Sequence, residues 1–87
     1  MKKLIIAAMV VVNLNADMCM FYIKDFTKNI VVMGQAIEFR DDDKVRSSYK
    51  DGKDTFYREL RYCDLSIHPR IKKNFNLFKA KYDNYFK

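Results

Sequence analysis

The feature that most constrains this chain of 87 residues is a pair of apolar stripes with helical spacing, each of which includes a cysteine. The first stripe comprises Cys19, Ile23, Phe26, Ile30, Met33 and Ile37. The second comprises Val45, Tyr49, Gly52, Phe56, Leu60 and Cys63. Steps of three and four residues are typical of one face of an amphipathic helix. The sequence therefore predicts two helices, over about residues 18–39 and 43–63.

The two stripes also fit each other as an antiparallel pair. If Cys19 lies opposite Cys63, the other stripe positions meet within one residue, and Phe26 faces Phe56. The centre of this register falls at Asp41, within the most polar stretch of the chain, where an aspartate is a good N-cap for the second helix. The sequence predicts a helical hairpin stapled by a Cys19–Cys63 disulfide, which would stabilise the fold by roughly 4 kcal/mol.

A β-structure is the competing interpretation of the same segments. Residues 30–33 and 36–39 are rich in strand-forming side chains, and Asp51-Gly52 is a signal for a hairpin turn. A glycine inside a helix costs about 1 kcal/mol relative to alanine. In the helical interpretation, Gly52 marks a kink or lets Ile30 approach closely.

A third apolar stripe near the C-terminus comprises Ile71, Phe75, Phe78, Tyr82 and Tyr85. It predicts an amphipathic helix over about residues 69–86, so that the fold class is all-α. Leu77 and Phe86 are expected to widen this stripe, Ser66 or His68 to cap the helix, and Pro69 to fit its first turn. The helix either packs its aromatic side chains on the hairpin, which we favour because a two-helix hairpin has little core, or leaves them exposed for docking.

Basic residues cover the other faces of this helix. Residues 70–87 carry a net charge of +5, and the candidate partner-binding side chains are Arg70, Lys72, Lys73, Lys79 and Lys81. A basic amphipathic helix suits an acidic protein partner, an anionic membrane or a cell-wall polymer. Basic residues interleaved with aromatics also suit single-stranded nucleic acid, a partner that an exported protein does not normally meet.

The N-terminus has the three-part order of a secretory signal peptide. Two lysines precede nine apolar residues, 4–12, and Ala16 is the small residue before the charged remainder of the chain. We expect cleavage after Ala16, which leaves residues 17–87 as one small helical domain in the periplasm or outside the cell. The alternatives are a transmembrane anchor, which needs about 20 apolar residues, and a buried strand.

No catalytic, cofactor or metal motif is evident in the sequence. His68 is the single histidine, and the adjacent Asp41, Asp42 and Asp43 lack the spacing of a calcium loop. Asp17, Met18, Cys19 and Met20, with His68, could form a copper site, but we favour a buried helix start whose cysteine is oxidised. We therefore expect a non-enzyme without cofactors or metals, whose main function is to bind an envelope protein. The first alternative is a module that binds an anionic membrane or cell-wall polymer, and the lower-ranked alternative is an intracellular nucleic-acid binder.

Overall fold

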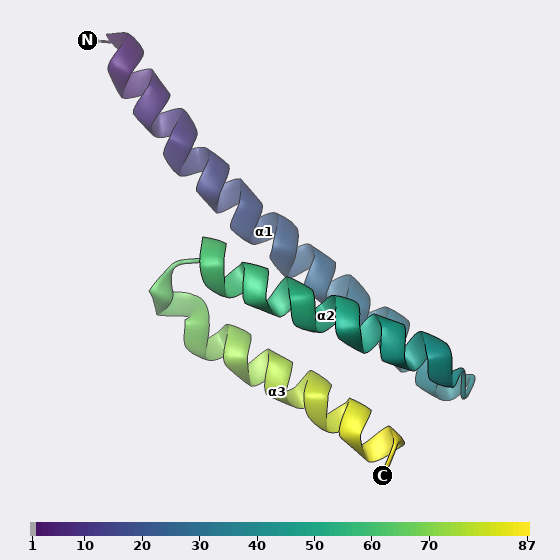
Figure 1. Cartoon of the computed structure of the whole chain (residues 1–87). Helices are drawn as coiled ribbons and strands as arrows, with labels where there is room; N and C mark the ends of the chain where they lie inside the picture. The colour runs from purple at the N-terminus through teal and green to yellow at the C-terminus, as the bar shows by residue number, and fades with distance from the viewer. Residues whose placement is uncertain (1) are drawn as a thin grey trace.

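The computed structural model describes the backbone from Lys2 to Lys87 and the side chains from Asp17 onwards. It contains α1 (Lys2–Glu38), α2 (Asp42–Tyr62), the short 3-10 helix η1 (Leu65–Ile67) and α3 (His68–Tyr85) (Figure 1). The predicted all-α class is confirmed. The first helix begins at Lys2, earlier than the predicted residue 18. The predicted signal peptide, residues 1–16, lies outside the residues whose side chains are described and stays a prediction.

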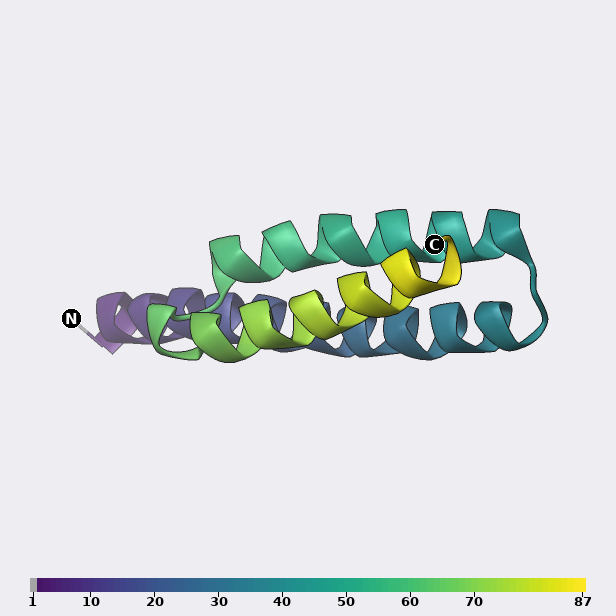
Figure 2. The same ribbon diagram turned by 90° about the horizontal axis from the view of Figure 1, so that it is seen from below.

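The three helices form an elongated bundle with extents of 59 × 21 × 14 Å. α2 folds back antiparallel along the C-terminal half of α1, and α3 returns along α2 in the direction of α1 (Figures 1 and 2). The N-terminal part of α1 projects beyond the other two helices (Figure 1). The disulfide therefore lies at the level where the three-helix part of the molecule begins.

Backbone hydrogen bonds close the corner between α1 and α2. Arg40 has a φ of 54°, and the amides of Arg40 and Asp41 donate to the carbonyls of Ile37 and Ala36, the two bonds of a Schellman motif. The Asp41 side chain then accepts a hydrogen bond from the Lys44 amide at 3.3 Å and caps α2. The predicted turn and N-cap are confirmed.

The core is built from apolar residues of all three helices. Its buried members include Phe26 and Met33 of α1, Val45 and Phe56 of α2, and Ile71, Phe75 and Phe78 of α3. Because Phe75 and Phe78 are buried, the alternative of an unpacked docking helix is wrong for these two side chains. Leu77 does not widen the buried stripe as expected, since 63% of its surface is exposed.

The aromatic residues of α2 pack mainly against α3. The ring of Phe56 stacks on Phe75 with centroids 4.1 Å apart, and that of Tyr49 stacks on Tyr82 at 4.0 Å. The expected pairing of Phe56 with Phe26 gives way to this stacking, while Phe26 meets the ring of Phe78 at 5.2 Å. α2 runs without interruption through Gly52, so the β-hairpin alternative is wrong.

The buried face of α2 is turned relative to the predicted stripe. Ser48, Thr55 and Glu59 are buried, whereas Tyr49 and Leu60 are only partly buried. The hydroxyls of Ser48 and Thr55 are satisfied by carbonyl oxygens one turn earlier, at 2.6 and 2.9 Å. The face turns because α2 must contact α1 on one flank and α3 on the other.

Candidate functional site

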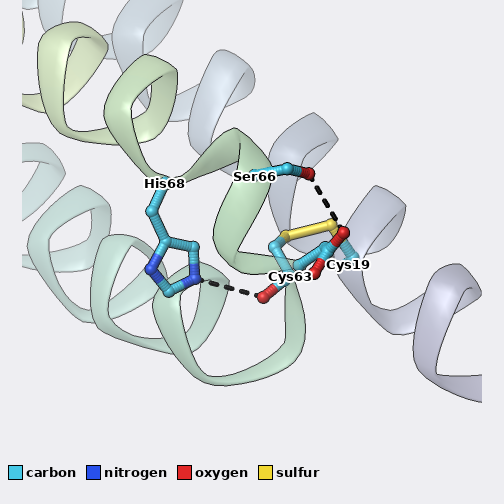
Figure 3. The surroundings of a disulfide bond; sticks show 5 residues. Cys19, Cys63, Ser66 and His68 are labelled. Carbon is cyan, nitrogen blue, oxygen red and sulfur yellow. Dashed lines mark hydrogen bonds between the residues drawn. A yellow bond between two sulfur atoms is a disulfide. The ribbon is translucent and has the colours of Figure 1, made fainter.

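The structure brings the two cysteines together as predicted. Their Sγ atoms lie 2.03 Å apart and their Cα atoms 4.8 Å apart, so α1 and α2 are joined across 44 positions of the sequence (Figure 3). Both side chains are buried. The disulfide fixes the register of α2 along α1 at the end of the hairpin where α3 begins.

His68 links the start of α3 to the backbone beside the disulfide. Its Nε2 lies 3.1 Å from the carbonyl oxygen of Cys63, a hydrogen bond that the ring donates when the proton is on Nε2 (Figure 3). The expectation that Ser66 or His68 caps α3 is wrong: Ile67 occupies the cap position without a side-chain bond, and the Ser66 hydroxyl donates to Asp64 instead. Pro69 lies in the first turn, as predicted.

The five candidate partner-binding residues do not form one patch. All five are exposed. Arg70 and Lys81 are three helical turns apart and lie on the side of α3 that faces α1. Lys72 and Lys79 are two turns apart on a different side, where Lys79 lies 3.8 Å from Asp83. Lys73 is exposed one turn after Arg70, while Lys72 and Lys79 lie nearly opposite Arg70 around the helix, so the positive charge is divided among the faces of α3.

A groove runs along the seam between α1 and α3. It consists of three hollows of about 280, 430 and 470 Å³ in order from the disulfide end. The first two share Ile30 and Asn74, and the last two share Lys81 and Asn84, so each hollow adjoins the next. The α1 side runs from Ile23 to Glu38, which corresponds to about 22 Å of helix.

The floor of this groove is apolar and its α3 rim is polar and basic. Ile30, Ile37 and Phe78 contribute to its floor, and Leu77 is a largely exposed apolar side chain at the edge. Arg70 and Lys81 stand on the α3 rim near the two ends. Such a surface offers apolar contact flanked by positive charge.

A buried carboxyl lies at the disulfide end of the groove. Glu59 of α2 is 3% exposed and lines the hollow of about 280 Å³. Its Oε1 atom has no hydrogen-bond partner among the residues that the structure describes. Burial raises the pKa of this carboxyl from 4.5 to about 7.

The sequence did not predict that Glu59 is buried, because its neighbour Leu60 was placed in the buried stripe of the second helix. Helical spacing allows either position, and an apolar side chain is normally the buried one. A signal did exist, since residues 48, 52, 55 and 59 continue the same three- and four-residue steps as a second stripe. That stripe consists of polar and small residues, which gave no reason to prefer it.

A second depression, on the far side of α2 and α1, has mixed charge. Its lining includes Asp25, Lys28, Asp51, Asp54 and Arg58. The Thr55 hydroxyl donates to Asp25 at 3.0 Å beneath it. Within residues 17–87, no three His, Cys, Asp or Glu side chains lie close enough to share a metal ion.

The chain has no detectable similarity to known proteins. No protein-family model matches the chain, and no curated protein sequence or solved structure does so. Among the residues that the structure describes, no helix is long and apolar enough to cross a membrane. The function is therefore inferred from the geometry of this surface.

Proposed function

We propose that this protein is a small exported, non-catalytic interaction protein, periplasmic or secreted, that binds an envelope protein along the groove between α1 and α3. The observation that carries this proposal is the row of adjoining hollows, which extends over about 22 Å and has an apolar floor. Grooves of this kind accept the apolar face of a helix or an extended segment.

The charges on the rim define the expected partner. Arg70 and Lys81 are exposed and are not among the ion pairs of the described residues. They favour a partner segment with apolar side chains toward the floor and acidic side chains toward α3. Glu38, at the far end, favours a basic or neutral residue there.

The composition of the groove favours binding over catalysis. Among the described residues that line the hollow at the disulfide end, Glu59 is the one carboxyl and Thr27 the one hydroxyl, and the Thr27 hydroxyl donates to the carbonyl of Ile23 at 2.9 Å. General acid–base or nucleophilic catalysis normally needs a second positioned group. A single buried carboxyl among isoleucines is better suited to holding a ligand.

The division of basic residues weighs against the alternative of an anionic surface. Binding to lipid or cell-wall polymer favours cations gathered on one face. Here Arg70 and Lys81 lie on one side of α3, and Lys72 and Lys79 lie on another. A groove-bound segment uses only the first pair.

Photo-crosslinking in the producing cells tests the groove. A crosslinking amino acid replaces either Leu77, which is exposed at the groove, or Tyr57, which is exposed on α2 and lines none of the three hollows. We expect a discrete protein adduct from position 77 and none from position 57. Equal adducts from both positions, or none from position 77, would contradict the proposal.

Two charge reversals serve as matched variants in that experiment. Lys81→Glu changes the rim of the groove, whereas Lys53→Glu makes the same change of net charge on an exposed part of α2. We expect Lys81→Glu to reduce the adduct at least fivefold and Lys53→Glu to leave it unchanged. If both variants lose the adduct equally, binding depends on overall charge and the anionic-surface alternative is favoured.

Export is tested separately by mass spectrometry of the native protein. We expect the N-terminus of the mature chain at Asp17, after removal of residues 1–16. A chain that retains Met1 in the exported fraction, or that stays in the cytoplasm, would contradict the exported location.

A further inference from the structure

The buried carboxyl of Glu59 requires an explanation that the fold alone does not give. A buried polar atom without a partner costs about 1–3 kcal/mol, and more if it is charged. Glu59 is 97% buried, and its Oε1 atom has no partner among the described residues. Nearby buried hydroxyls, such as that of Thr55, do have partners, so Glu59 is an exception in an otherwise satisfied interior.

The hollow beside Glu59 has the shape of a small ligand site. Its volume of about 280 Å³ is near the lower end of the range for ligand pockets, and it is the most enclosed of the three hollows of the groove. Its wall is mainly aliphatic, with Ile23 and Ile30 from α1, Ile67 from η1 and Ile71 from α3. The site combines one acidic group with a hydrocarbon wall.

We propose that this hollow binds a primary alkylammonium group, whose ammonium is held by the carboxylate of Glu59 and whose alkyl chain lies against the isoleucines. The ammonium supplies the missing hydrogen-bond donor and the opposite charge that a buried carboxylate needs. The proposal does not depend on the proposed protein partner. Either a free alkylamine or a lysine side chain offers this chemistry.

Other ligand classes fit the hollow less well. A divalent metal ion needs several acidic or imidazole ligands, which the described residues do not bring together. A guanidinium has five donors in a rigid plane, more than one carboxylate and the amide of Asn74 can satisfy. An anion would be repelled by Glu59.

Arg70 is the other charged residue in the lining of this hollow. α1 and η1 contribute only uncharged side chains to it, and α3 contributes Arg70 and the neutral Asn74. Arg70 is exposed and forms no ion pair with Glu59. It therefore acts as a competing cation at the mouth, and its removal is expected to strengthen the binding of an amine.

The test is a titration of the oxidised full domain, followed by amide chemical shifts in NMR. The probes are n-pentylamine and, as a neutral control of the same length, n-pentanol, both at pH 8, where Glu59 is mostly ionised. We expect the amine to shift the amides around Glu59, Ile23 and Ile71, and to bind at least tenfold more tightly than the alcohol. Equal binding of the two probes, or no binding of the amine, would overturn the proposal.

Two variants make the result specific to the carboxyl. Glu59→Gln keeps the shape of the side chain and removes its charge, so we expect at least a tenfold loss of amine affinity with an otherwise unchanged spectrum. Arg70→Gln changes only an exposed residue, and we expect it to bind the amine several-fold more tightly. Unchanged affinity in Glu59→Gln, or weaker binding in Arg70→Gln, would contradict the proposed geometry.

A second probe distinguishes the two sources of the group. Nα-acetyl-lysine methylamide carries the same ammonium on a chain attached to a peptide backbone. Binding of both probes identifies a site for lysine side chains, and binding of pentylamine alone identifies a site for free amines. Failure of both probes overturns the proposal but leaves the crosslinking test of the groove unaffected.

Discussion

The ring of Phe78 lies directly against the backbone of Gly52. A Cβ atom at position 52 would stand 2.6 Å from two carbon atoms of that ring and 3.5 Å from the Cβ of Asn29. Glycine is therefore required here for a close approach, although it is a poor helix former. The close neighbour is Phe78 of α3, where the sequence had suggested Ile30 of α1.

This contact predicts opposite effects for the two glycines. Gly52→Ala is expected to destabilise the domain by about 1–3 kcal/mol, because overpacking outweighs the gain of about 1 kcal/mol in helix propensity. Gly34→Ala is the control, because a Cβ there would meet nothing within 4 Å, and it should stabilise α1 by about 0.5–1 kcal/mol. Urea denaturation measures both changes. A stabilised Gly52→Ala would contradict the packing of α3 on α2.

The burial of Phe78 predicts a large cost for its removal. The side chain is 3% exposed, and we expect Phe78→Ala to lower stability by about 3–5 kcal/mol, as large aromatic truncations in cores do. Leu77→Ala, one residue earlier on the exposed side, should change it by less than about 0.5 kcal/mol. Thermal melts of the two variants beside the wild type provide the measurement. A shift below about 2 °C for Phe78→Ala would show that α3 is not packed as described.

The disulfide predicts a further loss of stability when it is removed. Cys63→Ser is expected to destabilise the domain by about 2–5 kcal/mol, because the bridge restricts the unfolded chain. Alkylation of the unreduced, denatured protein should label neither cysteine, and prior reduction should expose both. Labelling of both without reduction would show free thiols and would also weaken the case for export.

Glu59 predicts an unusual dependence of stability on pH. Its pKa is about 7 in the folded state and near 4.5 in the unfolded state, so between these values the folded protein binds more protons. This contribution to stability is fully present below about pH 4.5 and is lost as the pH rises through 7. The loss is on the order of 3 kcal/mol at pH 8.

The control for this prediction is Glu59→Gln, which cannot titrate. The other carboxylates contribute in both proteins, so the difference in unfolding free energy between wild type and variant isolates Glu59. Urea denaturation at pH 4.5, 6 and 8 should show that the unfolding free energy of the variant increases relative to that of the wild type as the pH rises. A difference that stays constant with pH would show that Glu59 is not buried in the folded protein.

The helices and their pairing were determined by local features of the sequence. The three- and four-residue steps that end at Cys19 and Cys63 predict the hairpin, and its bounds follow to within a few residues, apart from the start of α1. Asp41 predicts the corner, because a carboxylate satisfies the free amide of Lys44 whatever lies elsewhere. These inferences succeed because periodicity and capping depend on residues close together in the chain.

The candidate site was decided by the tertiary structure. Which of Glu59 and Leu60 is buried depends on how α2 turns between α1 and α3, and helical spacing allows both. The five basic residues form one group in the sequence, but the packing of Phe75 and Phe78 turns Arg70 and Lys81 toward α1 and leaves Lys72 and Lys79 on another side. A groove exists only where two separate helices lie beside each other, so its lining follows from the angle and distance between them, which no local pattern encodes.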